Sequence, residues 1–256
     1  MSAAPQNVLV TAAGKSVGRV MAEKFLARGD KVHVCDIDEN LLAQVLAANP
    51  SLGGTVCDVA QEGQVARLFE EARSRLGPID VLVNTVGISG PRGRIENLSL
   101  ADWRATLAAN LDSMFLTIRQ AVPDMRRNKR GAIVNFSTGS TKTVMPFRSP
   151  YVASKAGVEG LTKALARELG PDNIRINAIL PGMIDNDRMR GVIARIAQQE
   201  GRSAGDVERE ALNFVSMRSK IQPAEIADMV LFLCSAAAPN ISGQLIGVDG
   251  NIEWEA

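Results

Sequence analysis

The sequence predicts an α/β fold, a doubly wound parallel sheet with helices on both faces. Short apolar runs without polar alternation recur along the 256 residues, which is typical of strands buried on both sides. Longer amphipathic stretches separate these runs and supply the crossover helices that parallel strands need. No repeat, low-complexity tract or linker interrupts the alternation, so we expect a single domain over residues 1–256.

The predicted strands are rich in Val, Ile and Leu and too short for buried helices. In chain order they are Asn7–Thr11, Lys31–Asp36, Gly54–Asp58, Val81–Asn84, Ala132–Phe136, Arg175–Ile179 and Leu245–Val248. The stretches between them carry apolar residues at helical spacing, such as Val20, Phe25 and Leu26 in the first. The predicted helices are Gly18–Arg28, Glu39–Ala48, Glu62–Leu76 (ended by Gly77-Pro78), Asp102–Arg127, Pro150–Leu169 and Pro223–Ala236.

One segment, Asp185–Gln222, departs from this alternation. It is charged, rich in methionine and arginine, and patterned as one or two amphipathic helices. Insertions between a strand end and the next core helix commonly carry function. We therefore expect a substrate-loop insertion at about residues 185–222 that serves as a lid.

The composition is that of an ordinary globular protein. Hydrophobic residues make up 46% and charged residues 22%, and the net charge of +1 arises from 29 basic and 28 acidic residues. This balance predicts no nucleic-acid partner and no anionic membrane surface. No apolar run approaches the roughly 18 residues that span a bilayer, and Met1–Gln6 lacks the basic and apolar regions of a leader.

Cysteine and histidine usage narrows the chemistry. Cys35, Cys57 and Cys234 are odd in number and lack metal-site spacing, so we expect reduced thiols in a cytoplasmic protein and no metal. The single histidine, His33, lies within the apparent buried strand KVHVCDID, where a packed side chain is expected. A Ser-His-Asp triad or a histidine-rich metal centre is therefore not predicted, and acid-base chemistry needs another group.

The turn after the first strand, TAAGKSVGR at Thr11–Arg19, lies where such sheets bind phosphate. A dinucleotide loop needs glycines for the tight turn, for approach to pyrophosphate and for helix packing. Only Gly14 and Gly18 are present, so a generic strand-to-helix turn is the alternative. Asp36 ends the second strand, where a carboxylate accepts hydrogen bonds from the adenosine ribose and repels a 2′-phosphate. It favours NAD over NADP, although Lys15 is placed to pair with such a phosphate.

The stretch SPYVASKAG, Ser149–Gly157, holds the only tyrosine of the chain. Tyr151 and Lys155 are spaced i and i+4, so a helix projects both from one face. A phenol in water has a pKa of about 10 and is a weak base at neutral pH, but a nearby ammonium favours the phenolate. Such a pair can exchange a proton with an alcohol or a carbonyl group. The alternative is an aromatic residue on a helix face beside a solvated lysine.

With these motifs in order, the chain resembles the classical short-chain dehydrogenase/reductase family, which has a Rossmann fold, from Asn7 to about Asn251. Besides the loop and the Tyr-x-x-x-Lys pair, the matching motifs are NTVG at Asn84–Gly87, Asn110 in AANLDSMF, LPGMIDND at Leu180–Asp187 and the C-terminal GQLIGVDGN. The resemblance implies that Tyr151 is the general acid or base, that Lys155 also binds the nicotinamide ribose, and that Asn110 holds a water linked to Lys155.

The family's remaining catalytic group is a serine that binds the substrate oxygen, at the position that Thr138 occupies here. A threonine hydroxyl offers the same donor and acceptor, but its methyl group restricts the rotamer. We expect Thr138, and after it Ser140, to make this contact. Ser137 is a further candidate, and plain turn chemistry is the alternative for the two serines.

The resemblance also implies cofactor contacts along the carboxyl ends of the strands. The implied residues are Gly14, Ser16, Val17, Gly18, Asp36, Ile37, Asp58, Val59, Asn84, Gly87, Tyr151, Lys155, Pro181, Gly182, Ile184 and Asn186. A helix cap is the alternative for Asp58. Ala12 and Ser16 stand where the family usually has glycines, and we expect Gly14 to supply the backbone freedom lost there. Asn186 stands where a threonine often contacts the carboxamide.

These features predict an NAD(H)-dependent oxidoreductase that interconverts an alcohol and a ketone or aldehyde, acting on a small molecule. The alternative is a dinucleotide-binding sensor or scaffold with weak or no catalysis, for which the altered loop and Thr138 argue. The resemblance further implies a homotetramer.

The substrate pocket is expected between Gly87–Gly93, Val144–Arg148 and the insertion at 185–222. Nearby arginines either bind an anionic group of the substrate or are ordinary surface charges. They are Arg92, Arg148, Arg188 and Arg190.

Overall fold

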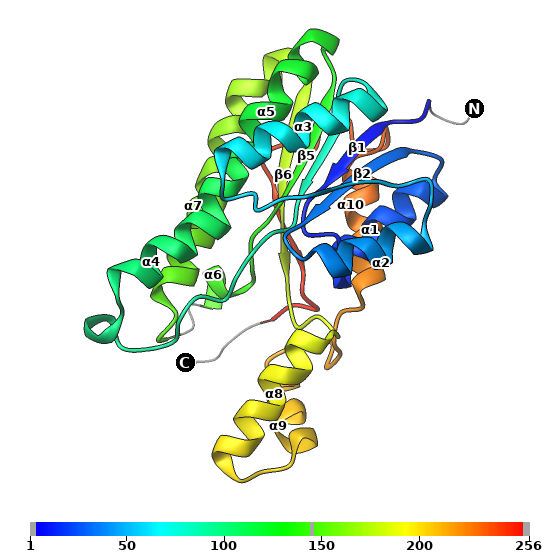
Figure 1. Cartoon of the computed structure of the whole chain (residues 1–256). Coiled ribbons are helices and arrows are strands. Elements are labelled where there is room, and N and C mark those ends of the chain that lie inside the picture. Colours follow the sequence, from blue (N-terminus) through cyan, green and yellow to red (C-terminus); the bar gives the residue numbers. More distant parts are fainter. Residues whose placement is uncertain (1–3, 144–145, 253–256) are drawn as a thin grey trace.

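The computed structural model describes residues 4–143 and 146–252 (Figure 1). Its strands form one parallel sheet of seven strands in the order β3-β2-β1-β4-β5-β6-β7. They are β1 (Asn7–Val10), β2 (Lys31–Asp36), β3 (Gly53–Val56), β4 (Val81–Asn84), β5 (Gly131–Phe136), β6 (Ile174–Pro181) and β7 (Leu245–Val248). The strand order reverses between β1 and β4, as in a doubly wound Rossmann sheet, which confirms the predicted fold class.

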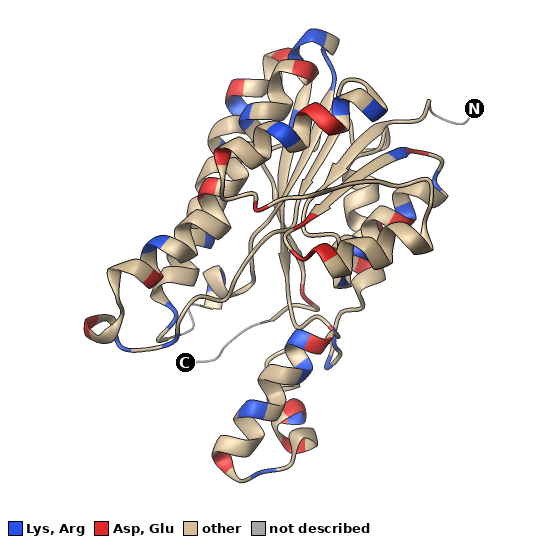
Figure 2. Cartoon of the chain, in the orientation of Figure 1, with Lys and Arg blue, Asp and Glu red and all other residues tan. Residues whose placement is uncertain are grey.

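Helices cover both faces of this sheet (Figure 1). One face carries α1 (Ser16–Ala27), α2 (Glu39–Ala48) and α10 (Pro223–Leu233), and the other α3 (Glu62–Leu76), α5 (Ser113–Asn128) and α7 (Ser149–Leu169). Val8 and Val10 of β1 are buried in the first core, and Leu9 between them is buried in the second. Because both faces are covered, successive strand positions are apolar, and the strands read as continuous hydrophobic runs. Figure 2 shows the two signs of charge interspersed over the helices.

The remaining elements lie mostly at the carboxyl end of the sheet. They are the 3₁₀ turns η1 (Ile95–Asn97) and η3 (Gly170–Asp172), α4 (Leu100–Leu107), the π-helical turn η2 (Ala108–Asp112), α6 (Ser140–Thr143), α8 (Asp187–Glu200) and α9 (Ala204–Leu212). The prediction of a single helix at Asp102–Arg127 is wrong in one respect: the helix is not continuous, because η2 separates α4 from α5. A π turn inserts one residue into a helix, and tertiary hydrogen bonds rather than a local pattern hold it here.

The insertion at 185–222 contains the two amphipathic helices α8 and α9. Their apolar sides share a small core with residues at each end of the insertion, made of Met183, Ile193, Ala197, Val207 and Val215. Ile184 and Ile221 form a parallel bridge, so the two ends of the insertion lie side by side. Figure 1 shows α8 and α9 projecting beyond the carboxyl end of β6.

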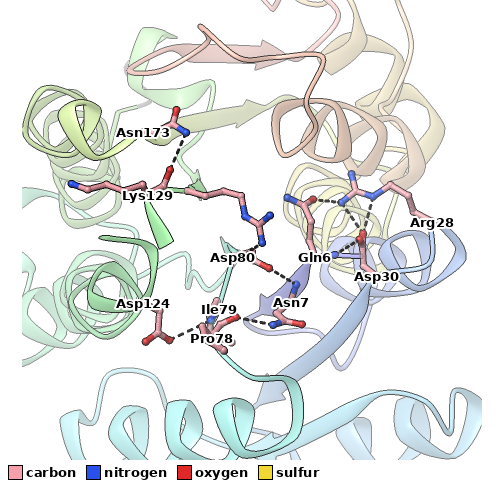
Figure 3. Close-up of polar contacts among 11 residues, drawn as sticks. Gln6, Asn7, Arg28, Asp30, Pro78, Ile79, Asp80, Asp124, Lys129 and Asn173 are labelled. Atoms are coloured by element: carbon pink, nitrogen blue, oxygen red, sulfur yellow. Dashed lines mark hydrogen bonds and ion pairs between the residues drawn. The ribbon is translucent and has the colours of Figure 1, made fainter. Parts of the chain in front are cut away.

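The amino end of the sheet is held by buried carboxylates (Figure 3). Asp80, just before β4, accepts hydrogen bonds from the backbone N–H of Asn7 (3.0 Å) and from Nη2 of Arg130 (2.8 Å). Asp30, just before β2, accepts one from the backbone N–H of Gln6 (3.0 Å). Charge-assisted bonds to backbone donors fix where neighbouring strands begin, so this end of the sheet is a rigid base.

His33 of β2 is a packed histidine, as predicted. Its side chain is 3% exposed, its Nε2 lies 2.9 Å from Oγ1 of Thr55, and burial lowers its pKa to about 4. The three cysteines are buried free thiols. Within the described part of the chain, no helix is long and apolar enough to cross a membrane, and no group of three or more His, Cys, Asp or Glu side chains is arranged to hold a metal.

Candidate active site

Tyr151 and Lys155 both lie in the first turns of α7, at the carboxyl end of β5. Tyr151 is half-buried, whereas Lys155 is only 3% exposed. The Nζ of Lys155 donates a hydrogen bond to the carbonyl oxygen of Phe136 (2.7 Å), the last residue of β5. The alternative of a solvated lysine is therefore wrong, because the amine is buried at the carboxyl end of the sheet.

The environment of Lys155 disfavours a positive charge. Burial, and after it the charge of Arg188, lowers the pKa of Lys155 to about 7. Gly87 makes room for this amine, because a Cβ at Gly87 would lie 3.0 Å from Nζ. A buried lysine whose pKa lies near neutrality is a common feature of catalytic sites.

Asn110 lies at the centre of the π turn η2 and is fully buried. Its Oδ1 accepts a hydrogen bond from the backbone N–H of Ile88 (2.7 Å), and its Nδ2 donates to the carbonyl oxygen of Ile88 (3.0 Å). Nδ2 also donates to Oγ of Ser154 (2.9 Å) on α7. Asn110 thus fixes the loop after β4 beside Lys155. The water implied at Asn110 stays a prediction.

The candidate hydroxyls at the end of β5 separate into two groups. Ser137 donates to Oε1 of Glu159 on α7 (2.7 Å), so its hydroxyl serves packing between β5 and α7. Thr138 Oγ1 lies 3.3 Å from Oγ of Ser140 and accepts a hydrogen bond from the Ser140 N–H (3.2 Å). Thr138 and Ser140 therefore stay together as candidates, and Ser137 does not.

The loop after β1 has positive φ at the two positions where the family usually has glycines. Ala12 has φ 49° and Ser16 has φ 53°, in the left-handed region that side chains disfavour. The expectation that Gly14 supplies this freedom is wrong, because Gly14 is not among the residues with positive φ. Gly14 is needed for space instead, since a Cβ there would lie 2.8 Å from Oδ2 of Asp36.

The N-terminus of α1 faces the carboxyl end of the sheet with its first-turn N–H groups available. Among the described residues no side chain caps this helix at Lys15. Gly18 packs α1 tightly on the loop, because a Cβ there would lie 2.3 Å from the carbonyl oxygen of Ala12. An uncapped helix N-terminus with close backbone packing is suited to bind a phosphate group.

Asp36 is 9% exposed and belongs to the structure of the loop. Its carboxylate accepts hydrogen bonds from the N–H of Gly14 (2.8 Å) and from the N–H of Asp38 (3.0 Å). An ionised carboxylate has about four lone-pair sites, so acceptor capacity remains for ribose hydroxyls. The neighbouring Ile37 is 68% exposed and lies beside this position.

Asn186 joins the insertion to the phosphate loop. Its Oδ1 caps α8 by accepting from the N–H of Met189 (2.9 Å), and its Nδ2 donates to Oγ of Ser16 (3.2 Å). An amide has further donor and acceptor sites, so these bonds leave capacity for the implied contact with a carboxamide. Asn186 therefore links the start of the insertion to the loop after β1.

Three other residues implied in cofactor binding have side chains that are buried within the protein. Val17 and Val59 are 7% and 4% exposed and belong to the two cores. The Asn84 amide lies buried between Asn135 (3.0 Å) and Thr117 (2.9 Å). Side-chain contacts from these residues to a ligand are thus not available.

Three further implied positions follow β3 and β6. Asp58 accepts a hydrogen bond from the N–H of Ala60 (3.0 Å), so the alternative that it caps α3 is wrong. Gly182 follows Pro181 and donates its N–H to the carbonyl oxygen of Val248 (3.0 Å), which ties the end of β6 to β7. Ile184 lies in the bridge at the base of the insertion.

The walls of the expected substrate pocket are only partly described. Val144 and Met145 lie outside the described residues. The backbone N–H of Gly93 donates to the carbonyl oxygen of Phe147 (3.0 Å), which brings two predicted walls together. Beside them is a hollow of about 380 Å³ lined by residues 93–96, Phe147 and Ser149.

Residues 11–251 match the family described as enoyl-(acyl carrier protein) reductase. A 7α-hydroxysteroid dehydrogenase of Escherichia coli K12 is 32% identical over 246 residues, covering 94% of this chain and 92% of the relative. The 3-oxoacyl-[acyl-carrier-protein] reductase MabA of Mycobacterium bovis is 33% identical over 247 residues, covering 96% and 92%. The chain belongs to the short-chain dehydrogenase/reductase family.

Solved structures of this family superpose on the whole chain. A single-substitution variant of the actinorhodin polyketide ketoreductase with NADPH has a TM-score of 0.91 and 29% identity, covering 98% of both chains. A 7α-hydroxysteroid dehydrogenase with NADH and 7-oxo glycochenodeoxycholic acid has a TM-score of 0.88 and 30% identity, covering 97% of this chain and 94% of that one. The protein is thus an oxidoreductase of the short-chain dehydrogenase/reductase type, a group that acts on CH–OH groups.

Sequence reasoning missed the supporting residues of this site. Ser154 accepts a hydrogen bond from Asn110 and so helps to position it. Glu159 accepts the hydrogen bond of the Ser137 hydroxyl, which is why Ser137 is no longer a candidate. Both lie on α7 at helical spacing from Tyr151, so the predicted helix already indicates that they lie on the same face as Tyr151. Which side chain each one contacts, Asn110 of η2 for Ser154 and Ser137 after β5 for Glu159, is decided by the tertiary fold, and no local pattern contains that information.

Proposed function

We propose that this protein is an NAD(H)-dependent dehydrogenase or reductase that interconverts an alcohol and a ketone or aldehyde, with Tyr151 as general acid and base. The observation that carries the proposal is the burial of Lys155 at the end of β5, one helical turn after Tyr151. A lysine placed there without a functional role is unfavourable, because burial of its charge opposes folding.

The residues present fit a dinucleotide. The uncapped N-terminus of α1 offers backbone N–H groups to a pyrophosphate, and Asp36 keeps acceptor capacity for ribose hydroxyls. Lys155 is placed to bind the second ribose beside Gly87. When bound, a nicotinamide dinucleotide supplies or accepts hydride at its C4 atom.

The proton is handled by residues of this chain. Tyr151 gives a proton to the substrate oxygen in carbonyl reduction and takes it in alcohol oxidation. The Thr138 hydroxyl, supported by Ser140, orients that oxygen by a hydrogen bond. Below pH 7 Lys155 is mainly an ammonium that stabilises the phenolate, since its pKa is about 7.

The preference for NAD over NADP rests on Asp36. Its carboxylate is fixed by two backbone hydrogen bonds, so a 2′-phosphate beside it meets a negative charge that cannot move away. The named relatives include structures with NADH and with NADPH. We expect kcat/KM to be higher for NADH than for NADPH, and Asp36→Asn to reduce the difference. Higher activity with NADPH in the unaltered protein contradicts this assignment.

The test of the catalytic assignment compares Tyr151→Phe with the unaltered protein. NADH absorbance with a broad panel of ketones, aldehydes and alcohols identifies a substrate. Tyr151→Phe should then lose activity by about 100-fold or more, the usual contribution of a general acid, and still bind NADH. Lys155→Met should lose activity to a similar extent, and Lys163→Met, at an exposed lysine on the same helix, should not. Unchanged turnover in Tyr151→Phe refutes the proposal.

A second candidate function is a dinucleotide sensor or scaffold. Left-handed backbone at Ala12 and Ser16, and the contact from Ser16 to Asn186 in the lid, favour it because they alter the loop that approaches pyrophosphate. NADH binding without turnover of any member of the panel would support this candidate over an enzyme.

A homotetramer remains part of the proposal. Phe115 of α5 is 49% exposed, with Arg119 at 5.9 Å from its ring, and α5 belongs to the faces expected to pair. Exposed aromatic residues are common in subunit interfaces. Size-exclusion chromatography with light scattering tests it, and a monomeric mass contradicts it.

A further inference from the structure

Two arginines from distant segments meet beside Tyr151. Arg148 directly precedes α7, and its guanidinium lies 4.7 Å from the centroid of the Tyr151 ring. Its Nη2 donates to the carbonyl oxygen of Ser89 (3.3 Å). Arg188, in the first turn of α8, donates to the carbonyl oxygen of Gly87 (3.3 Å) and to the hydroxyl of Ser89. Ser89 is thus contacted by one guanidinium on its carbonyl and by the other on its hydroxyl.

Within the described part of the chain, no carboxylate pairs with these two arginines. Neither guanidinium has a carboxylate within 4.0 Å among the described residues. The Nε of Arg148 is buried and has no hydrogen-bond partner in the same part of the chain. A buried donor without an acceptor is unfavourable, so a partner from outside the chain is expected.

Further cations add to the local charge. Burial lowers the pKa of Arg148, and the charges of Arg188 and Arg92 lower it further. The charge of Arg188 also contributes to the lowered pKa of Lys155. Arg148 is half-buried, whereas Arg188 and Arg92 are exposed. Their like charges repel one another, and a bound anion relieves that repulsion.

Arg190, two residues after Arg188, shows the ordinary arrangement of an arginine in this helix. It forms ion pairs with Asp185 (2.7 Å) and Asp187 (2.8 Å). The start of α8 therefore has carboxylates within reach of arginine, and Arg190 uses them. A purely structural role for Arg148 and Arg188 is the weaker explanation, because it leaves the buried Nε–H of Arg148 without an acceptor among the described residues.

We propose that the substrate carries a carboxylate group, which Arg148 and Arg188 bind above residues 87–89 while its carbonyl or hydroxyl group meets Tyr151. This assignment rests on the proposed oxidoreductase function. Guanidinium and carboxylate groups match in geometry and charge. The guanidinium of Arg148 is 4.7 Å from the Tyr151 ring centroid, so only a few bonds separate the carboxylate from the reacting carbon. The substrate class is therefore short oxo acids and the corresponding hydroxy acids.

The test compares levulinate with methyl levulinate, which differ in charge but share the ketone, in reduction by NADH. We expect kcat/KM to be about 10–100-fold higher for levulinate, since charged hydrogen bonds contribute about 1.5–3 kcal/mol. Arg148→Met and Arg188→Met should each raise KM for levulinate and lower kcat/KM for levulinate more than for methyl levulinate, so that the preference for the acid shrinks. Arg148→Lys should restore part of the preference, and Arg190→Met should leave it intact. A preference for the phosphonate analogue of levulinate overturns the carboxylate assignment.

A binding measurement separates this inference from the proposed function. In Tyr151→Phe with NADH bound, NADH fluorescence follows levulinate binding without turnover, and Arg148→Met should weaken that binding about 10–100-fold. If levulinate and methyl levulinate bind equally, the carboxylate site is overturned and the oxidoreductase function stands. The same conclusion follows if Arg148→Met changes only the affinity for NADH. Arginine-dependent binding of levulinate without turnover by the unaltered protein overturns the function and leaves the site.

Discussion

At the amino end of the sheet, Asp80 and Asp124 lie buried against arginines. At the carboxyl end, Lys155 is buried and Arg148 is half-buried, and neither has a carboxylate partner among the described residues. Asp80 is 4% and Asp124 1% exposed, and each forms ion pairs. Lys155 is 3% exposed and bonds only a backbone carbonyl among the described residues. A fold can stabilise buried charge by pairing it, so charge left unpaired at one end indicates where a ligand supplies the partner.

The largest expected effect comes from breaking a pair at the amino end. Asp124 Oδ2 accepts hydrogen bonds from Nε of Arg73 (2.8 Å) and from the N–H of Ile79 (3.2 Å). Asp124→Asn keeps the shape and removes the charge, so we expect the free energy of unfolding to fall by about 3–5 kcal/mol. Urea denaturation measures this change.

The control for this prediction is Glu62→Gln, at a pair in which Arg119 and Glu62 are 53% and 62% exposed. Solvent screens such pairs, so the change in unfolding free energy should be too small to resolve. Equal destabilisation by the two variants would show that burial does not distinguish the ion pairs, and the comparison of the two ends would lose its basis.

His33 lies between these two ends, and its burial is tolerated in a third way, because the imidazole stays neutral. Burial lowers its pKa from 6.5 to about 4 in the folded protein. The unfolded chain therefore binds more protons between these values, so stability is complete above pH 6.5 and falls as pH falls toward 4. The loss attributable to His33 is about 3 kcal/mol at pH 4, from the shift in pKa.

Because His33 is the only histidine, its NMR titration is a direct measurement. The single histidine ring signal should titrate near pH 4. Between pH 6.5 and about 4.5, the free energy of unfolding should fall less steeply in His33→Gln than in the unaltered protein. A midpoint near 6.5 in the folded protein would mean that a buried imidazolium is tolerated without a counter-charge, which contradicts the reasoning applied to the arginines.

Much of this arrangement follows from sequence pattern, and its limits have physical causes. The bounds of β2, α2, α3 and β4 agree with prediction, because Asp38 caps α2 and Gly77 ends α3 with φ 90°. The break at η2 and the role of Gly14 were not predictable, because partners far along the chain decide them: Ile88 for the one and Asp36 for the other.

The candidate site divides in the same manner. The i, i+4 spacing on a helix places Tyr151 and Lys155 on one face whatever their neighbours are. The choice between Ser137 and Thr138 depends on Glu159, which accepts the hydrogen bond of the Ser137 hydroxyl. Arg148 and Arg188 were indistinguishable from Arg190 in the sequence, and only their contacts with Ser89 separate them.

A smaller effect is expected at the carboxyl end when one unpaired cation is removed. Lys155 has a lowered pKa of about 7, so its ammonium is present below that pH and lost above it. Arg188→Gln removes a repelling charge and should raise this pKa, which moves the alkaline limb of kcat/KM for NADH to higher pH. With methyl levulinate as substrate the change at neutral pH should be below about tenfold, since one pKa unit corresponds to about 1.4 kcal/mol.

Arg190→Gln provides the control for that pH profile. Its guanidinium is already neutralised by Asp185 and Asp187, so its loss should leave the limb in place. Identical shifts in the two variants would show that Lys155 responds to the summed charge of α8 rather than to Arg188, and the unpaired state of Arg188 would then carry no special meaning.

The smallest effect tests backbone strain at the two ends. Ala12, in the loop after β1, has φ 49°, and Lys129, just before β5, has φ 48°. Glycine adopts this conformation without steric cost, while it also adds entropy to the unfolded chain. Ala12→Gly and Lys129→Gly should therefore each raise the free energy of unfolding by about 0.5–1 kcal/mol, measured by urea denaturation. NADH affinity should respond to Ala12→Gly alone, because only that loop faces the proposed pyrophosphate site. If Lys129→Gly changed NADH affinity equally, the two ends of the sheet would be coupled, and strain at Ala12 could not be assigned to dinucleotide binding.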